Sequence, residues 1–342
     1  MKITKILVAL SFLFAISTAN AGELTVTGNM EATYHTQSDK TTGNPLGMDR
    51  ELKFAGSTEL DNGITVSVMQ DTGDSLTYGN SQIMFGGVAG MFDIYVGSDS
   101  DPVDAIDDIT PSAYEEANGS GSGTYTSNDI GGNAGQMGIG AKVSLPILGA
   151  LNVKYYPDAD SQKNADNASS GDQGNGGSAY AASLKTNLGE LPFVGSFLDG
   201  ATLTTGVGEY KNSRIANSDN AFDLTAAVNY NIGNFSLGVQ KKVHSEGETG
   251  TTSTTDAVRY KDTIIGIAYA VNDNLSISYN TYDSYKKNAD GDGAPDQETS
   301  AINIGYTMGG MTIGFQDAQT DNDNYTRDST DDTRTLGISV AF

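Results

Sequence analysis

The sequence predicts an all-β protein that forms a closed, transmembrane, antiparallel β-barrel of sixteen strands, and three observations lead to this prediction. Segments in which apolar and polar residues alternate recur along almost the whole chain, and a two-residue period is that of a strand with unlike faces. Short turns alternate with long polar connections between these segments, as they do in membrane barrels. Beyond the first 21 residues, no stretch approaches the ~18–20 apolar residues of a transmembrane helix.

The alternation is clearest in the second half of the chain. In the runs 235–240, 275–280 and 311–316, large apolar residues occupy one face of the expected strand and small or polar residues the other. The same pattern marks the sixteen expected strands, which are 23–35, 49–60, 64–71, 80–87, 91–97, 136–145, 150–156, 179–188, 201–210, 221–232, 235–244, 259–271, 275–283, 299–307, 311–318 and 333–342.

The connections and the number of segments help to distinguish a barrel from a soluble sandwich. Asp61-Asn62-Gly63 has the composition of a tight hairpin turn, and long polar connections are expected at 36–48, 98–135, 157–178, 245–258, 284–298 and 319–332. A sandwich would show the same alternation with its apolar face turned inward. The number and regularity of the segments favour a closed barrel, because closure leaves no unpaired strand edge in lipid.

Residues 1–21 are expected to be a secretory signal peptide. Lys2 and Lys5 precede a short apolar run, and Ala19-Asn20-Ala21 supplies the small residues of a cleavage site. Residues 22–342 would then form a single barrel domain outside the cytoplasm, after Sec-type export. The chain has no Cys, so it has neither disulfides nor thiolate metal sites.

The net charge of the chain argues against nucleic acid as a partner but is compatible with weak binding of divalent cations. The formal net charge of −24 at pH 7 argues against nucleic-acid binding. No cofactor is expected, and the only metal binding considered is weak Ca²⁺ or Mg²⁺ binding at acidic external loops. Residues 288–298 resemble an EF-hand loop, but the twelfth position is Thr299 instead of Glu, so a metal site is not predicted.

Catalysis is not expected either. The chain has only two His residues, His35 and His244, and both fall on the polar face of their strands. A membrane phospholipase would need a serine nucleophile and a histidine base within hydrogen-bond reach on the lipid-facing side.

The connection 98–135 is the main candidate site. No Lys or Arg occurs between Lys53 and Lys142, and a long irregular segment inside a β-rich chain is either functional or disordered. We expect it to fold into the barrel mouth and narrow it; the alternative is a solvated acidic surface loop. Its candidate constriction residues are Asp101, Asp104, Asp107, Asp108, Glu115 and Glu116.

Strand parity places five lysines on the inner wall, namely Lys53, Lys142, Lys154, Lys185 and Lys242. Either they are scattered wall charges, or some face the acidic connection across the pore. The second arrangement would create a transverse field that orients dipolar solutes, while a net acidic ring attracts cations.

Three stretches resemble the general porins of Gram-negative outer membranes, which are trimeric sixteen-stranded barrels, and the proteobacterial branch in particular. They are Glu51–Val66, Phe85–Gly97 and Leu336–Phe342. The chain departs from this family at Ser98, where Arg is frequent, and in 109–116, which lacks the usual Pro-Glu-Phe-Gly-Gly pattern. It also has no Trp.

The resemblance implies an outer-membrane homotrimer with water-filled channels for passive diffusion of small hydrophilic solutes and ions. It implies that the third external loop, here 98–135, lies in the lumen. The partners would be lipopolysaccharide and other outer-membrane lipids, and the barrel-insertion machinery, which recognises a terminal aromatic residue such as Phe342.

Two other functions remain as alternatives to a cation-selective diffusion porin. A substrate-specific channel would line its path with aromatics, and the inner face is expected to hold few beyond Tyr156 and Tyr282. A structural or adhesive surface barrel would have a blocked lumen.

Overall fold

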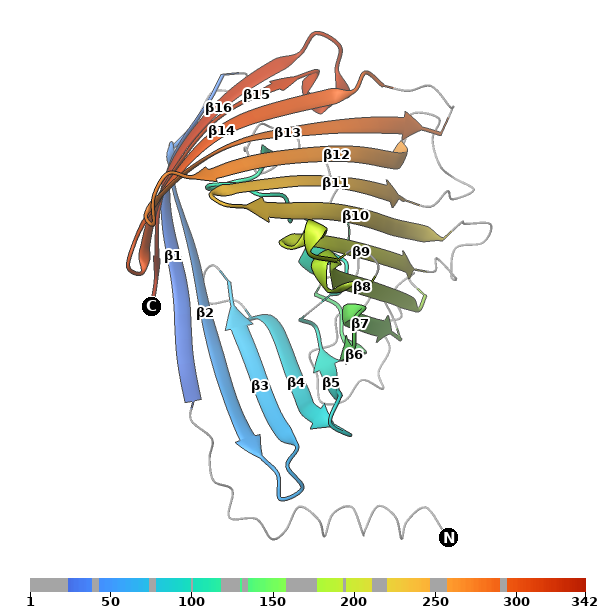
Figure 1. The fold of residues 1–342 in the computed structure, drawn as a ribbon. Helices are drawn as coiled ribbons and strands as arrows, with labels where there is room; N and C mark the ends of the chain where they lie inside the picture. The colour runs from blue at the N-terminus through green and yellow to red at the C-terminus, as the bar shows by residue number, and fades with distance from the viewer. Residues whose placement is uncertain are drawn as a thin grey trace.

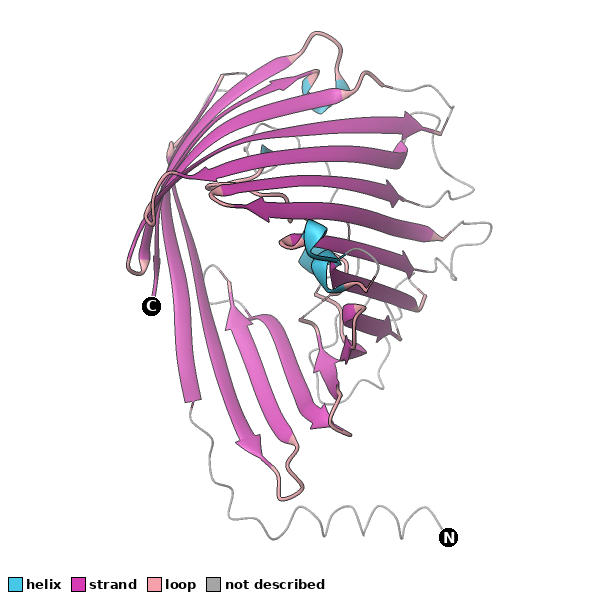
Figure 2. Ribbon diagram, in the orientation of Figure 1, coloured by secondary structure: helices cyan, strands magenta, loops and turns pink. Residues whose placement is uncertain are grey.

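Sixteen antiparallel strands close into one barrel in the computed structural model, which confirms the predicted fold class (Figures 1 and 2). The structure describes residues 24–38, 43–73, 78–99, 101–117, 130, 135–157, 177–192, 195–210, 220–246, 257–289 and 294–342. The expected signal peptide, most of 118–134 in the long third connection, and 290–293 of the EF-hand-like stretch lie outside the described residues.

The strands follow the expected ones closely. They are β1 (Leu24–Gln37), β2 (Leu46–Glu59), β3 (Thr65–Thr72), β4 (Tyr78–Val88), β5 (Phe92–Gly97), β6 (Gly138–Leu145), β7 (Gly149–Tyr156), β8 (Ala179–Asn187), β9 (Ala201–Tyr210), β10 (Ala221–Ile232), β11 (Phe235–Ser245), β12 (Ala257–Ala270), β13 (Leu275–Asn288), β14 (Gln297–Met308), β15 (Met311–Asp321) and β16 (Thr330–Ala341). The largest difference is at β13, which runs to Asn288 instead of residue 283. Its polar, tyrosine-rich end pairs with β12 up to Ala257, so long-range pairing extends a strand that the local composition would end.

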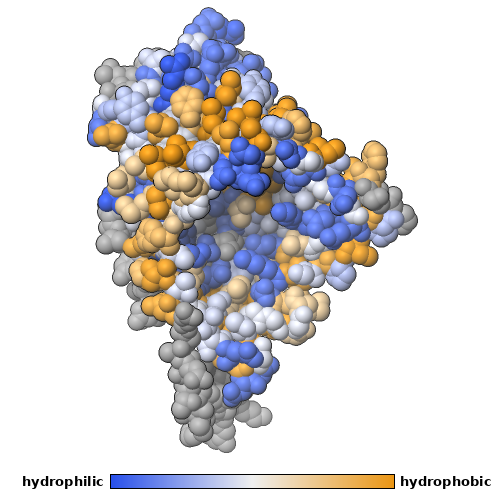
Figure 3. Space-filling view, turned by 60° about the vertical axis from the view of Figure 1, so that its left-hand side comes forward, coloured by the Kyte–Doolittle hydropathy of each residue, from blue (hydrophilic) through white to orange (hydrophobic). Residues whose placement is uncertain are grey.

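The two faces of the wall differ sharply in chemistry. Apolar side chains such as Val239, Ile277 and Ile302 are 41%, 43% and 56% exposed on the outside. Polar side chains of the opposite parity, Gln240 and Asn280 among them, are fully buried inside. Figure 3 shows apolar patches beside a hollow with hydrophilic walls. An outward apolar face is the reverse of a soluble sandwich and fits a barrel in lipid.

Helices contribute little to the described residues. They are the short 3-10 turns η2 (Asp104–Ile106), η4 (Leu188–Glu190), η5 (Gly195–Leu198) and η6 (Asp323–Tyr325). In this part of the chain, no helix has both the length and the apolar character to cross a membrane.

The seam between β1 and β16 closes the barrel. Ala32 of β1 pairs with Ile338 of β16 on one side and with Met48 of β2 on the other. Beyond the end of β16, the Phe342 amide donates to the Gly28 carbonyl at 3.0 Å, and the Gly28 amide donates back at 2.9 Å. A Cβ on Gly28 would lie 2.6 Å from the Phe342 ring, so this glycine makes room for the aromatic side chain.

This seam yields a prediction for assembly. Phe342→Ala keeps the backbone bonds to Gly28 but removes the ring, which is the group that the insertion machinery is expected to recognise. The amount of folded barrel in the membrane should therefore fall, while the conductance of each surviving channel stays the same. Gel mobility with and without heating and single-channel recording measure the two quantities. Ile338→Ala, on the outer face of the preceding strand β16, is the control; equal yields of all three proteins would contradict the prediction.

Candidate pore constriction

Residues 101–117, called the inner segment here, begin with a turn organised by Asp101. The Asp101 carboxylate accepts the backbone amides of Val103 and Asp104 at 2.8 and 3.1 Å. Its second oxygen accepts the hydroxyl of Tyr156 on β7. Asp101 is only 2% exposed, so its charge stabilises the start of η2 and does not face open water.

An ion pair ties the middle of the inner segment to β11. The Lys242 ammonium lies 2.8 Å from Asp107 Oδ1 and 3.6 Å from Asp108 Oδ1. The Lys242 side chain is completely buried, and its ammonium lies 5.5 Å from the centre of the Tyr282 ring. Asp107 also accepts the backbone amide of Ile130 at 3.2 Å. A buried charge is tolerated only with such partners, so this pair fixes the position of the segment.

Amide side chains of the wall form hydrogen bonds with backbone amides and carbonyls of the inner segment. Gln240 donates to the Ile106 carbonyl at 2.8 Å and accepts the Ile109 amide at 3.3 Å. Asn229 donates to the Ile109 carbonyl at 2.7 Å, and Asn280 to the Pro111 carbonyl at 2.9 Å. These bonds explain how the polar side chains of Gln240 on β11 and Asn280 on β13 are buried, since buried polar groups need partners.

Glycines let the segment touch the wall backbone. A Cβ on Gly266 of β12 would lie 2.5 Å from the Pro111 carbonyl oxygen. A Cβ on Gly314 of β15 would collide with the ring of Tyr114. Any larger residue at either position would push the segment away from the wall.

The far end of the inner segment reaches β1 and β15. The Tyr114 hydroxyl donates to Glu31 Oε1 of β1 at 2.6 Å. Gln316 of β15 donates to the carbonyls of Glu115 and Glu116 at 3.2 and 3.1 Å. The segment therefore runs along the polar inner face from β7 past β11 and β13 to β1.

The six candidate acids fall into three environments. Asp101 and Asp107 are buried, whereas Asp104 and Asp108 are exposed. Glu115 and Glu116 are half-buried, and burial raises the pKa of each to about 7. The charges of Glu31 and Asp108 raise the pKa of Glu115 further, while a hydrogen bond from Thr110 opposes the shift at Glu116. In the described residues, Asp104 and Asp108 are the two exposed acids of this set, and Asp108 is exposed although its Oδ1 lies 3.6 Å from the Lys242 ammonium.

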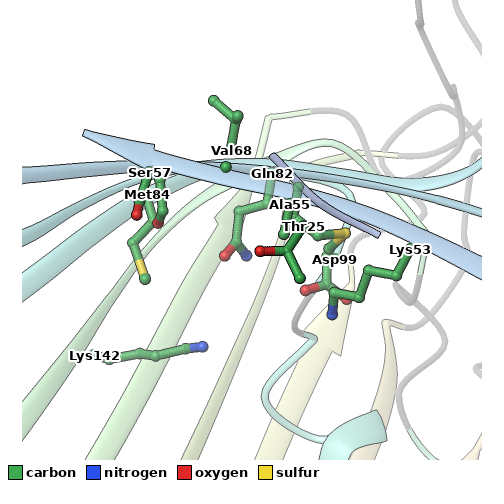
Figure 4. A pocket seen from close by; sticks show the side chains of 12 residues that line it. Thr25, Lys53, Ala55, Ser57, Val68, Gln82, Met84, Asp99 and Lys142 are labelled. Atoms are coloured by element: carbon green, nitrogen blue, oxygen red, sulfur yellow. The ribbon is translucent and has the colours of Figure 1, made fainter. Parts of the chain in front are cut away.

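The five candidate lysines divide in a similar way. Lys154 is 2% exposed, and its ammonium donates to the Asp99 carbonyl at 2.8 Å. Unlike Lys242, it holds the chain just before the inner segment. Lys53 and Lys142 line a cavity of about 440 Å³ together with Asp99, and Lys142 and Lys185 line a second cavity of about 210 Å³. In Figure 4 the side chain of Val68 on β3 points away from the face that carries Lys53 of β2 and Gln82 of β4, as expected for residues on opposite faces of the sheet.

The family model of Gram-negative porins matches residues 7–325. The chain belongs to this family. Three solved structures share its fold. OmpT of Vibrio cholerae has a TM-score of 0.65 and 11% identity, covering 96% of this chain and 100% of its own. Salmonella typhi OmpF in complex with daunomycin has a TM-score of 0.63 and 13% identity, covering 94% and 98%. A mutant porin of Rh. blastica has a TM-score of 0.57 and 13% identity, covering 94% and 100%. No curated protein matches the chain.

Family membership confirms the predicted location and broad activity. This porin resides in the outer membrane of a Gram-negative cell, and it is a diffusion channel, not an enzyme. His244 contacts two carboxylates. Its Nδ1 lies 2.5 Å from Asp223 Oδ1, and its Nε2 lies 3.4 Å from Glu246 Oε1. Among the described residues, no group of three or more His, Cys, Asp or Glu is arranged to hold a metal ion.

Sequence reasoning missed most residues that seat the inner segment in this porin. Glu31, Asn229, Gln240 and Asn280 carry only one signal, a polar residue at an inward position. That signal does not reveal a partner far away in the chain: Gln240 and Ile106 are 134 residues apart. Tyr95 is another buried polar residue of the interior, where its hydroxyl donates to Asn152 Oδ1 at 2.8 Å.

The Lys242–Asp107 pair gives a prediction for the porin's stability. Lys242→Met should leave Asp107 without its cation, and breaking a buried pair costs about 3–5 kcal/mol. The inner segment should loosen, which lowers the midpoint of thermal unfolding and adds current noise in single-channel recordings. Adding Asp107→Leu to Lys242→Met should restore part of the loss, because it removes the buried carboxylate closest to Lys242.

Lys185→Met is the control for this experiment, because Lys185 is an inward but exposed lysine. If the Lys242 and Lys185 variants have the same unfolding midpoint and noise, the ion pair does not hold the segment.

Proposed function

We propose that this porin passes small hydrophilic solutes and ions with a preference for cations, and that Asp104 and Asp108 set this preference. One observation carries the proposal: these are the two acids of the inner segment that are both exposed and located where the segment lies against the inner wall. Asp107 is neutralised locally by Lys242, and Asp101 is committed to its turn.

The distance of a charge from the ion path decides how strongly that charge affects ion selectivity. The total charge of −24 is spread over the whole chain. At physiological salt, charges more than ~8–10 Å from the ion path are largely screened. Selectivity at such salt must therefore come from carboxylates on the narrowest part of the path. The exposed pair on the inner segment meets this requirement better than acids on the external connections.

Basic side chains also line the interior of the barrel. Lys53 and Lys142 line the larger cavity, and Asp99 contributes a carboxylate to the same cavity. Opposed charges across a narrow aqueous path produce a transverse field, which aligns dipolar solutes and disfavours apolar ones. This arrangement supports passage of small hydrophilic molecules as well as ions.

A substrate-specific channel has less support. The interior holds more tyrosines than expected, but Tyr95, Tyr156 and Tyr282 are at most 4% exposed. They pack into the wall and offer no aromatic track to a sugar. A structural barrel with a blocked lumen has less support too, because a cavity of about 440 Å³ is lined by residues of β1 to β4 together with Asp99 and Lys142.

We also infer that the protein assembles as a homotrimer in which each chain encloses its own pore. The support comes from relatives: the OmpT of Vibrio cholerae, at 10% identity, is described in a trimer form. Exposed apolar side chains on the outer wall are available either to lipid or to such a contact.

The first prediction concerns charge. Replacing Asp104 and Asp108 together by Asn should lower the cation-to-anion permeability ratio by a factor of about two, since charges near the ion path escape screening by salt and both carboxylates are exposed. Reversal potentials in a salt gradient, recorded at low and at moderate salt, measure the ratio. Asp273→Asn, in an exposed short turn, is the matched control. If all variants shift the potential equally, selectivity arises from the overall charge of the protein and not from the inner segment.

The second prediction concerns pH. Glu115 and Glu116 have pKa values raised to about 7 by burial, so they gain protons as the pH falls from 8 to 6. The path loses negative charge over this range, and the cation preference should weaken. Recording the reversal potential against pH measures the change, and the double variant Glu115→Gln, Glu116→Gln should show a flatter profile. A wild-type profile that is flat between pH 6 and pH 8 would rule out this role.

A further inference from the structure

Residues 322–329, called the outer segment here, connect β15 to β16 in an unusual conformation. Four of its non-glycine residues have positive φ: Asn322 at 52°, Asn324 at 56°, Tyr325 at 53° and Asp328 at 61°. Asn and Asp tolerate this region, but a bulky residue such as Tyr does so only where its surroundings hold it. The conformation of Tyr325 therefore points to a specific anchoring contact.

That contact is a socket on β12 and β13. The Tyr325 hydroxyl lies 2.7 Å from Ser284 Oγ, and its ring centre lies 5.9 Å from that of Tyr260. The Lys286 ammonium lies 5.3 Å from the centre of the same ring. Tyr325 is only 5% exposed, so the socket encloses it almost completely.

Further hydrogen bonds hold the backbone of the outer segment. The Asn324 amide donates to Gln297 Oε1 at 2.9 Å, and the Asn322 side chain donates to the Asp296 carbonyl at 2.8 Å. The Asp328 amide donates to Asn322 Oδ1 at 3.2 Å. The segment is thus a fixed element of the structure.

The socket belongs to the inner face of the wall. Tyr260 and Ser284 have the same strand parity as Gly266 and Asn280, which contact the inner segment. The outer segment is therefore turned inward, over the ends of β12 and β13 that lead into the long external connections.

A line of polar contacts joins the two segments along this wall. Ser284 Oγ, which contacts Tyr325, also donates to Asp262 Oδ1 at 2.6 Å. Asp262 faces Lys242 across β11 and β12 in the strand register. Lys242 in turn holds Asp107 of the inner segment at 2.8 Å. Both segments are thus mounted on one column of wall residues.

We propose that the outer segment is a second constriction, on the external side of the inner segment, and that Tyr325 is the residue that positions it. A solute entering from outside meets the outer segment first and the inner segment next, both on the same side of the barrel. The outer segment excludes large solutes before they reach the carboxylates of Asp104 and Asp108. This proposal rests on the proposed function only in that the barrel must conduct.

The first test uses Tyr325→Ala, Tyr325→Phe and uncharged polyethylene glycols of graded size. Polymers that enter the pore lower its conductance. Tyr325→Ala should admit polymers that the wild type excludes from the external side, whereas Tyr325→Phe, which keeps the ring, should stay closer to the wild type. Tyr279→Ala, an outward tyrosine on β13 that is 49% exposed, is the control and should leave the size limit unchanged. An unchanged limit in a folded Tyr325→Ala channel overturns the proposal.

The second test stands on its own if Tyr325→Ala does not fold. The chain has no Cys, so Thr326→Cys introduces a single reactive thiol into the exposed part of the outer segment. A bulky thiol reagent added from the external side should lower the conductance, and reduction should restore it. Thr263→Cys, on the outward face of β12, should show no change. A modified Thr326→Cys channel with unchanged current overturns the proposal, whereas a wild-type protein without any conductance would refute the channel function itself.

Discussion

The requirement that every backbone amide and carbonyl in a lipid environment find a partner governs this structure. Strands satisfy it only if each has a neighbour on both sides, so the sheet must close on itself. The pairing of β1 with both β2 and β16 achieves this closure. Because a strand has a period of two, closure also gives each strand one face toward lipid and one toward the interior.

The same requirement, applied inside the barrel, explains how an irregular segment lies in the interior. Residues 101–117 have no partner strand, so their amides and carbonyls need other groups. The wall supplies them through side chains such as Gln240, Asn229 and Asn280. Two acids of the segment follow the same logic, since Asp107 meets Lys242 and Asp101 accepts backbone amides, and both are buried, whereas Asp104 and Asp108 are exposed.

The fold was largely predictable from the sequence because its main signal is local. Alternation over eight to fourteen residues identifies a strand wherever it occurs, and all sixteen strands were found in this way. The roles of individual charges were not predictable. Asp101 and Asp104 look alike in the sequence, yet one is buried under Tyr156 and the other is exposed. Lys142 and Lys154 share the same parity, and only Lys154 is buried, with its ammonium on the Asp99 carbonyl. Such differences depend on contacts between residues far apart in the chain, which strand periodicity does not record.

The glycines beneath the inner segment have a consequence for how such a channel changes over time. Gly266 and Gly314 touch Pro111 and Tyr114 from behind, on the side away from the water. A single added methyl group there would move the segment toward the pore axis without altering any group that a solute meets. Substitutions on the supporting wall can therefore change the width of the passage while its charge pattern stays constant. The size limit for solutes and the preference for one sign of charge can thus vary independently among related channels.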